Sequence, residues 1–169
     1  MIKIIKYQKL LKNYQNNINI NSLRLRNINL YDKNIIYKWS NDILTRKNSL
    51  TKKRIKIYEH NSWFSKQINS KNNLFWMCLY NNNRIGFVRL DKCKQFYKLN
   101  YLINPKYRGL GLAKKMIKLS LKKYRFKNKI PIIAEVKKNN LKSKRILLEC
   151  NFVCTNNYIY DKIFVLKYI

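Results

Sequence analysis

Hydrophobic and polar residues alternate along some stretches of this chain and recur at helical spacing along others. Alternation predicts strands at 22–26, 75–80, 84–91, 97–103, 132–136, 158–160 and 163–168. Helical spacing predicts four helices: one after Asp32, one from about Lys53, one from close to Gly111 to Tyr124, and one capped by Asn140. Residues 46–49 are predicted to form a loop. The order β-α-α-β-β-β-α-β-α-β-β is that of a mixed α/β fold in a single domain.

The stretch 99–124 carries the strongest local signal. The chain has three glycines, and two of them, Gly109 and Gly111, lie between a predicted strand and an amphipathic helix. Glycine lets the backbone approach a ligand closely and adopt conformations that a β-carbon disfavours. The free N–H groups and positive dipole end at the start of a helix favour an anion. These residues therefore predict a backbone cradle, most naturally for a phosphate.

The composition is strongly basic. Lys and Arg number 38 against 7 Asp and Glu, which gives a formal net charge of +31. Such a charge is typical of proteins that bind polyanions. The lysines are spread along nearly the whole chain, however, together with many Asn, Ile and Tyr, all of which have AT-rich codons. A coding bias explains this mixture at least as well, and we expect no specific nucleic-acid partner.

No apolar run approaches the roughly 20 residues that span a bilayer, so we expect no membrane partner. Residues 1–20 form a basic extension without the features of a secretory signal. The four cysteines lack the spacing of metal ligands and the chain has one histidine, so no metal site is predicted. Buried, reduced thiols in the cytoplasm are the default interpretation.

Two motifs resemble a known family. Arg108, Gly111 and Ala113 form the pattern Arg-x-x-Gly-x-Ala, and further along the chain Asn140-x-x-Ser143 follows the segment Ala134-Glu135-Val136. The arrangement resembles the GCN5-related N-acetyltransferases (GNAT) from about Leu23 onward. The resemblance implies a single-domain α/β GNAT fold over 21–169, with a mixed, mostly antiparallel sheet of six to seven strands flanked by about four helices. It also implies acetyl-CoA as the co-substrate.

The resemblance assigns the co-substrate site residue by residue. Backbone amides of the loop would hold the pyrophosphate; these residues are Arg108, Gly109, Leu110, Gly111, Leu112 and Ala113. Ile103 would pair its backbone with pantetheine, and Asn140 and Ser143 would line that arm. A helix cap is an equally good interpretation of Asn140, and both roles are compatible.

The resemblance also indicates the catalytic groups. The backbone N–H of Tyr101 would polarise the acetyl carbonyl. Glu135 matches a position proposed as the base in related sugar acetyltransferases, and positioning the substrate ammonium through hydrogen bonds is its alternative role. His60 is the rival base because its pKa suits proton transfer. Leu147 stands where many members carry a tyrosine that protonates the departing thiolate. A thiol with a pKa of about 8.5 is a fair leaving group, so this departure need not abolish turnover.

The first half of the chain bears on the acceptor. Its segments around Trp39, Arg46 and Trp63 look like a subgroup that acetylates UDP-linked amino-deoxy sugars in pseudaminic acid synthesis. The candidate substrate-binding residues are Trp39, Arg46, Asn48, Trp63 and Arg89. Protein N-termini and small amines are alternative acceptors, and a basic binding module without activity is the alternative of another class. The sequence leaves open whether the protein forms a homodimer.

Overall fold

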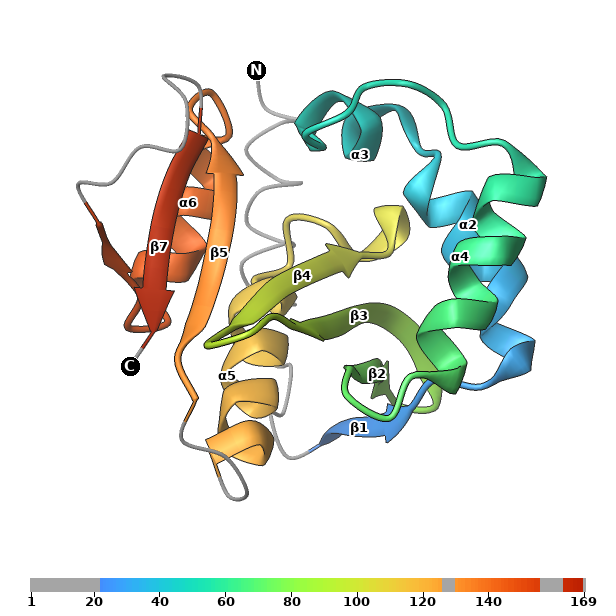
Figure 1. Cartoon of the computed structure of the whole chain (residues 1–169), viewed down its shortest axis with the longest axis horizontal. Coiled ribbons are helices and arrows are strands. Elements are labelled where there is room, and N and C mark those ends of the chain that lie inside the picture. Colours follow the sequence, from blue (N-terminus) through green and yellow to red (C-terminus); the bar gives the residue numbers. More distant parts are fainter. Residues whose placement is uncertain (1–21, 126–129, 156–162, 169) are drawn as a thin grey trace, which may run out of the picture.

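Seven strands form a single sheet in the order β1-β2-β3-β4-β5-β7-β6 (Figure 1). The structure is a computed structural model that describes residues 22–125, 130–155 and 163–168. Neighbouring strands are antiparallel except β4 and β5, which are parallel. The strands are β1 Leu23–Asn27, β2 Leu74–Tyr80, β3 Asn83–Lys92, β4 Tyr97–Ile103, β5 Ile132–Lys137, β6 Val153–Cys154 and β7 Ile163–Tyr168. The α/β fold with a mostly antiparallel sheet is confirmed.

The helices include one that the sequence pattern did not predict. They are α2 Lys33–Ser40, α3 Ile43–Asn48, α4 Ile57–Asn69, α5 Leu112–Arg125 and α6 Leu141–Leu148. The prediction of a loop at 46–49 was wrong for 46–48. Asp42 begins α3, because its carboxylate accepts the backbone N–H of Thr45 at 3.0 Å. The helix expected from about Lys53 begins at Ile57, where Glu59 accepts the N–H of Lys56 at 2.7 Å.

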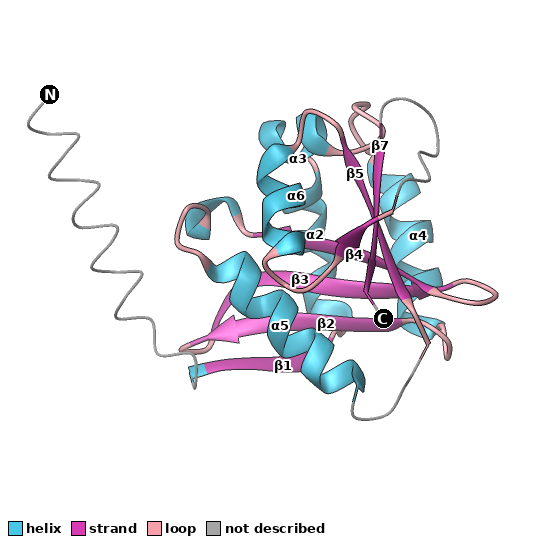
Figure 2. Ribbon diagram, turned by 90° about the vertical axis from the view of Figure 1, so that its left-hand side faces the viewer, coloured by secondary structure: helices cyan, strands magenta, loops and turns pink. Residues whose placement is uncertain are grey.

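The helices divide between the two faces of the sheet (Figure 2). On one face α5 and α6 bury Met116, Ile117 and Leu147 against the larger apolar core. On the other face α2 and α4 bury Ile36 and Phe64 in a second core. None of the helices in the described part of the chain has the length and apolar composition of a membrane span.

The two central strands separate along their length. β4 and β5 pair only at Tyr97 with Ile132 and at Lys98 with Ile133. Beyond these pairs β5 turns away from β4, as Figure 1 shows. The backbone of β4 after Lys98 therefore borders an opening in the sheet.

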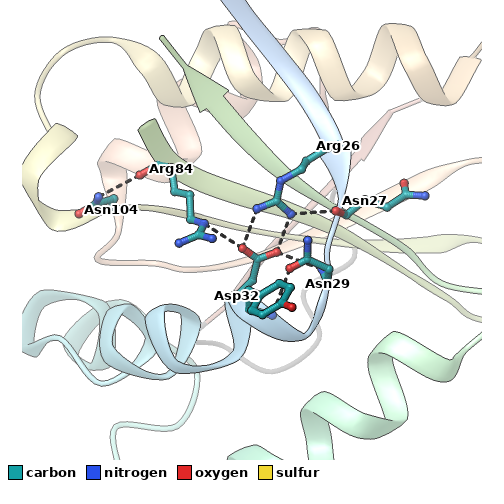
Figure 3. Close-up of polar contacts among 7 residues, drawn as sticks. Arg26, Asn27, Asn29, Asp32, Arg84 and Asn104 are labelled. Carbon is teal, nitrogen blue, oxygen red and sulfur yellow. Dashed lines mark hydrogen bonds and ion pairs between the residues drawn. The ribbon is translucent and has the colours of Figure 1, made fainter. Parts of the chain in front are cut away.

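A buried ionic cluster fixes α2 to the sheet (Figure 3). Asp32 lies at the predicted cap position of α2, yet its side chain makes no cap hydrogen bond. Its carboxylate is fully buried and binds Arg26 at 2.6 Å and Arg84 at 3.0 Å. Burial alone would raise the pKa of Asp32, but hydrogen bonds from Arg26 and from the N–H of Asn29, with the two arginine charges, lower it.

Two predictions lie outside the described residues: the basic extension at 1–20 and the strand at 158–160. The C-terminal strand is confirmed as β7, which pairs with β5 and with the short β6. Shortly after the end of α6, Asn151 adopts the left-handed conformation with φ of 66°, which asparagine tolerates better than most residues.

Candidate active site

The loop before α5 has the predicted conformation of a cradle. Gly109 has φ of 80° and Gly111 has φ of 69°, values that side-chain-bearing residues rarely adopt. No heavy atom lies within 4 Å of the place where a β-carbon would project from either glycine. The first N–H groups of α5 follow at once, because the helix begins at Leu112. The loop thus presents backbone N–H donors beside open space, which fits an anionic group such as a pyrophosphate.

The side chain of Arg108 leaves this loop and binds α3. Its guanidinium lies 2.6 Å from the carboxylate of Asp42 and donates a hydrogen bond to Thr45 Oγ1 at 2.7 Å. Burial alone would raise the pKa of Asp42, but hydrogen bonds from Thr45 and Arg108 lower it. Arg108 therefore connects the cradle to the start of α3.

Backbone N–H groups of β4 face the opening between β4 and β5. The N–H of Tyr97 bonds to Pro131, and the N–H of Asn104 bonds to Ile85 on β3. Successive N–H groups along a strand point to opposite sides. Those of Tyr101 and Ile103 therefore point into the opening, as their predicted roles toward the acetyl carbonyl and pantetheine require.

The start of α6 borders the same opening. Asn140 caps this helix, because its side-chain oxygen accepts the N–H of Ser143 at 3.2 Å. The hydroxyl of Tyr101 donates a hydrogen bond to Ser143 Oγ at 3.0 Å, across 42 residues of sequence. The cap interpretation of Asn140 is confirmed, and its contact with pantetheine stays a prediction.

A cavity of about 270 Å³ lies on the other face of the sheet, between the α2–α4 region and strands β3 and β4. It contains four residues predicted for catalysis or acceptor binding in the first half of the chain, and it also reaches Tyr101. Its lining consists of Ser40, Thr45, Arg46, Ser49, Ile55, His60, Trp63, Phe87, Arg89, Asn100, Tyr101 and Leu102.

Two predicted acceptor residues do not line this cavity. Trp39 is buried in the second core with 5% of its surface exposed, because α2 turns it toward the sheet. Asn48 is exposed at the end of α3. Neither residue is therefore placed against this cavity, and the contact of each with the acceptor stays a prediction.

The charges that line the cavity are positive. Arg89 lies 2.7 Å from Asp91 and stacks over Trp63, its guanidinium carbon 4.8 Å from the ring centroid. Arg46 takes part in none of the ion pairs between described residues. Its guanidinium donates to Ser49 Oγ at 2.8 Å and to the carbonyl of Lys53 at 3.2 Å.

The two candidate bases have different surroundings. His60 lines the cavity and is 1% exposed. Its Nε2 forms a hydrogen bond with the carbonyl oxygen of Lys33 at 2.9 Å. Burial lowers the pKa of His60, and this hydrogen bond only partly offsets the effect. Glu135 lies on β5 in an ion pair with Lys98 at 2.6 Å and is not part of the cavity lining.

Some lining residues were missed from the sequence. Thr45 and Ser49 belong to α3 and its cap, a helix without buried residues and so without an apolar stripe to reveal it. Asn100 could have been found from the sequence, because its side chain must face the side of the sheet opposite to that of its neighbour Tyr101 on β4.

The family model of the acetyltransferase (GNAT) domain matches residues 22–153. The chain belongs to this family. The prediction of an acetyl-CoA-dependent N-acetyltransferase is thereby confirmed at the level of the family. None of the curated proteins matches the chain in sequence.

Solved structures with the same fold are distant in sequence. Spermidine N-acetyltransferase from Vibrio cholerae, in complex with CoA and spermine, has a TM-score of 0.77 at 20% identity and covers 88% of this chain and 95% of its own. A domain from Methanocaldococcus jannaschii has a TM-score of 0.76 at 20% identity, covering 86% and 97%. An aminoglycoside acetyltransferase in complex with coenzyme A has a TM-score of 0.73 at 13% identity, covering 87% and 94%.

Proposed function

We propose that this protein transfers the acetyl group of acetyl-CoA to the primary amine of an acceptor that carries negative charge, in the form of a UDP-linked amino-deoxy sugar. The observation that carries this proposal is Arg46, a cationic cavity residue without an acidic partner among the described residues. The cysteines of the described chain are free thiols, which suits a reducing cytoplasm.

Arg46 is half-buried in an environment that penalises its charge. Burial lowers the pKa of Arg46, and its Nε is buried without a hydrogen-bond partner. A buried charge without a counter-ion costs free energy that a bound anion recovers. A phosphate suits this place, because guanidinium N–H groups bind its oxygens in a planar fork.

Further positive charge lies next to Arg46. Burial lowers the pKa of Lys137, and the charges of Lys52 and Arg46 lower it further. The ammonium of Lys137 donates to the carbonyl of Lys47 at 3.2 Å, which keeps the end of β5 close to α3. An acceptor with a diphosphate would reduce the repulsion among these groups.

The remaining lining suits a sugar. A cavity of about 270 Å³ is smaller than most sites that enclose a whole drug-sized ligand, which begin at about 300 Å³. The amino sugar would fill it, with the nucleotide toward the lysines. Trp63, over which Arg89 stacks, adds apolar surface beside the sugar, and Asn100 offers an amide for hydroxyl groups.

Polycationic acceptors are the main alternative. The two structural neighbours named for their acceptors acetylate spermidine and aminoglycosides. No carboxylate lines the cavity in the described part of this chain. A polyamine would meet Arg46 and Arg89 unfavourably. Protein N-termini and other small amines carry a single positive charge and no phosphate. They are weaker alternatives because the arginines of the cavity would repel this charge as well.

The amine must lose a proton before its nitrogen attacks the thioester. Glu135 is our first candidate to accept it, directly or through water, because it lies on the strand that borders the opening and on the face of the cavity. His60 is the second candidate, since a lowered pKa leaves its ring neutral near pH 7. The N–H of Tyr101 would stabilise the oxyanion.

Release of free CoA thiol with a set of acceptors tests this function. We expect turnover of the UDP-linked amino sugar with kcat/KM about 10-fold or more above that of the same amino sugar without the nucleotide, since a phosphate–arginine pair is worth roughly 1.5–3 kcal/mol. Spermidine, aminoglycosides and N-terminal peptides should be poorer acceptors. Efficient acetylation of spermidine would refute the proposed acceptor class.

Arg46→Gln identifies the residue that recognises the anion. The variant should raise KM for the nucleotide-linked sugar about 10-fold or more and leave KM for the free amino sugar nearly unchanged. Because Arg46 also holds residues 49–53, a purely structural role would raise both values equally. Lys66→Gln, which removes an exposed charge at the end of α4, is the matched control.

A further inference from the structure

The sulfur that leaves acetyl-CoA becomes negatively charged as the C–S bond breaks. A thiolate in a protein-lined opening is stabilised by a hydrogen-bond donor. The family resemblance implies a tyrosine on α6 for this task, at the position of Leu147. Leu147 has no donor group and is fully buried in the apolar core. A donor to the sulfur would have to come from another residue.

One hydroxyl group reaches the same face of α6 from the sheet. Tyr101 on β4 donates its hydrogen bond to Ser143 Oγ at 3.0 Å. Ser143 lies four residues before Leu147, and residues four apart share a helix face. The hydroxyl of Tyr101 therefore lies close to the part of α6 where a tyrosine at position 147 would project.

The contact between Tyr101 and Ser143 spans the opening in the sheet. Pairing of β4 with β5 ends at Lys98, three residues before Tyr101, and α6 follows β5 in the chain. The backbone of Tyr101 borders the opening, so the same residue presents a backbone N–H and a side-chain hydroxyl to it.

The anion cradle lies on the same side of the sheet as this hydroxyl. The helix α5, which begins at the cradle, packs with α6 on the larger core, and Cys150 Sγ lies 3.7 Å from the carbonyl oxygen of Lys114. A co-substrate held by the cradle would extend along α6, and an amine bound in the cavity would lie on the opposite face. The bond that breaks would then lie between the two, next to Tyr101.

We propose that the hydroxyl of Tyr101 donates a hydrogen bond to the departing sulfur and so replaces the donor that position 147 lacks. The amine nitrogen forms its bond to the acetyl carbon and passes its proton to the base, for which Glu135 is our first candidate. The C–S bond breaks with its electron pair on sulfur. The hydroxyl turns from Ser143 to that sulfur. The hydroxyl of Ser143 can then donate a hydrogen bond to the tyrosine oxygen, and solvent supplies the proton that converts the thiolate to the thiol.

The surroundings of Tyr101 keep its hydroxyl protonated at neutral and mildly alkaline pH, so that it can donate a hydrogen bond. Burial raises the pKa of Tyr101 to about 12, although the hydrogen bond with Ser143 acts in the opposite direction. A hydroxyl with such a pKa stays protonated at neutral and mildly alkaline pH. It stabilises the thiolate as a hydrogen-bond donor without giving up its proton.

Tyr101→Phe tests the proposal with two readouts. The first is thiol release with the best acceptor, for which kcat should fall about 10- to 100-fold while KM for acetyl-CoA changes little. The second needs no acceptor: the thiol pKa of bound CoA, followed by thiolate absorbance against pH with the acetyl-CoA complex as the blank. This pKa should be about one to two units higher in the variant than in the unaltered protein.

Two further variants separate catalysis from structure. Ser143→Ala removes the same hydrogen bond but keeps the tyrosine hydroxyl, so a purely structural role predicts equal kcat values in the two variants. The proposal predicts a kcat for Tyr101→Phe at least about 10-fold below that of Ser143→Ala. Tyr124→Phe removes another buried tyrosine hydroxyl, on α5 and away from the opening, and should leave the thiol pKa unchanged.

The second readout also separates this inference from the proposed function. The inference rests on acetyl transfer and is independent of the acceptor's identity. An unchanged thiol pKa in Tyr101→Phe, with kcat within twofold of the unaltered protein, would overturn it. A raised thiol pKa in a protein that acetylates spermidine best would support Tyr101 and refute only the nucleotide-sugar acceptor.

Discussion

The two faces of the sheet offer different chemical groups to the two substrates that we propose. On the face of α5 and α6, the proposed co-substrate site consists of backbone N–H groups, two glycines and the hydroxyls of Tyr101 and Ser143, above an apolar core. On the face of α2 and α4, the cavity is lined by Arg46, Arg89 and aromatic rings. Backbone groups suit a co-substrate that is always the same, whereas charged side chains can vary with the acceptor. The second face is therefore where specificity should change on mutation.

The largest expected effect lies on the co-substrate face. Gly111→Val places a β-branched residue at φ of 69° and adds a side chain to the open space of the cradle. Backbone strain of roughly 1–3 kcal/mol and obstruction of the anion should together weaken CoA binding about 100-fold or more. Isothermal titration calorimetry with CoA measures this directly.

Gly111→Asn separates strain from obstruction. Asparagine tolerates the left-handed conformation better than valine, so the loop should keep its shape. CoA binding weakened to a similar degree would indicate obstruction of the cradle. Unchanged CoA affinity in both variants would contradict the assignment of the cradle.

On the face proposed for the acceptor, a buried ion pair also stabilises the fold. Asp32→Asn leaves Arg26 and Arg84 without their counter-ion at a fully buried position. The free energy of unfolding should fall by about 2–3 kcal/mol, below the range for fully buried pairs because the arginines are about a third exposed. Urea denaturation measures the loss, and CoA affinity should remain unchanged in the folded protein.

The same carboxylate gives the stability a defined pH dependence. The pKa of Asp32 is lowered in the folded protein, so its contribution is complete above the unfolded value of about 4 and is lost as pH falls through the folded value. Urea denaturation between about pH 5 and 3 should show a steeper loss of stability in the unaltered protein than in Asp32→Asn. Parallel curves would show that Asp32 titrates normally.

A smaller effect is expected where the two faces meet. Arg108→Gln removes the ion pair with Asp42 and the hydrogen bond to Thr45, which join the cradle to α3. Because α3 carries Arg46, KM for the acceptor should rise about 3- to 10-fold together with KM for acetyl-CoA. Steady-state kinetics with both substrates varied measures the two values. A change confined to acetyl-CoA would show that Arg108 serves the cradle alone.

Local sequence patterns predicted the secondary structure of the face proposed for the co-substrate, because its features lie close together in the chain. The strand Tyr97–Ile103, the glycines with positive φ and the cap at Asn140 all depend on a few neighbouring residues. The acceptor face depends on packing between distant segments. Two tryptophans, Trp39 and Trp63, both lie at helical spacing, and only the tertiary structure buries the first and turns the second to the cavity.

Pairs that join distant residues escaped prediction for the same reason. The ion pair of Lys98 with Glu135 spans 37 residues and changes the surroundings of the predicted base. The contact of Tyr101 with Ser143 spans 42 residues and gives the tyrosine side chain a place in the site that its strand position alone did not indicate.

Amide hydrogen exchange of the protein with CoA, and separately with a UDP-linked amino sugar, tests the division between the two faces most directly. We predict that CoA protects residues 109–117 and 99–103, and that the nucleotide sugar protects residues 42–63. A second cavity exists on the chain, lined in part by Arg26, Arg84 and Lys106. Protection by the nucleotide sugar at 79–84 and 104–107, with none at 42–63, would contradict the account.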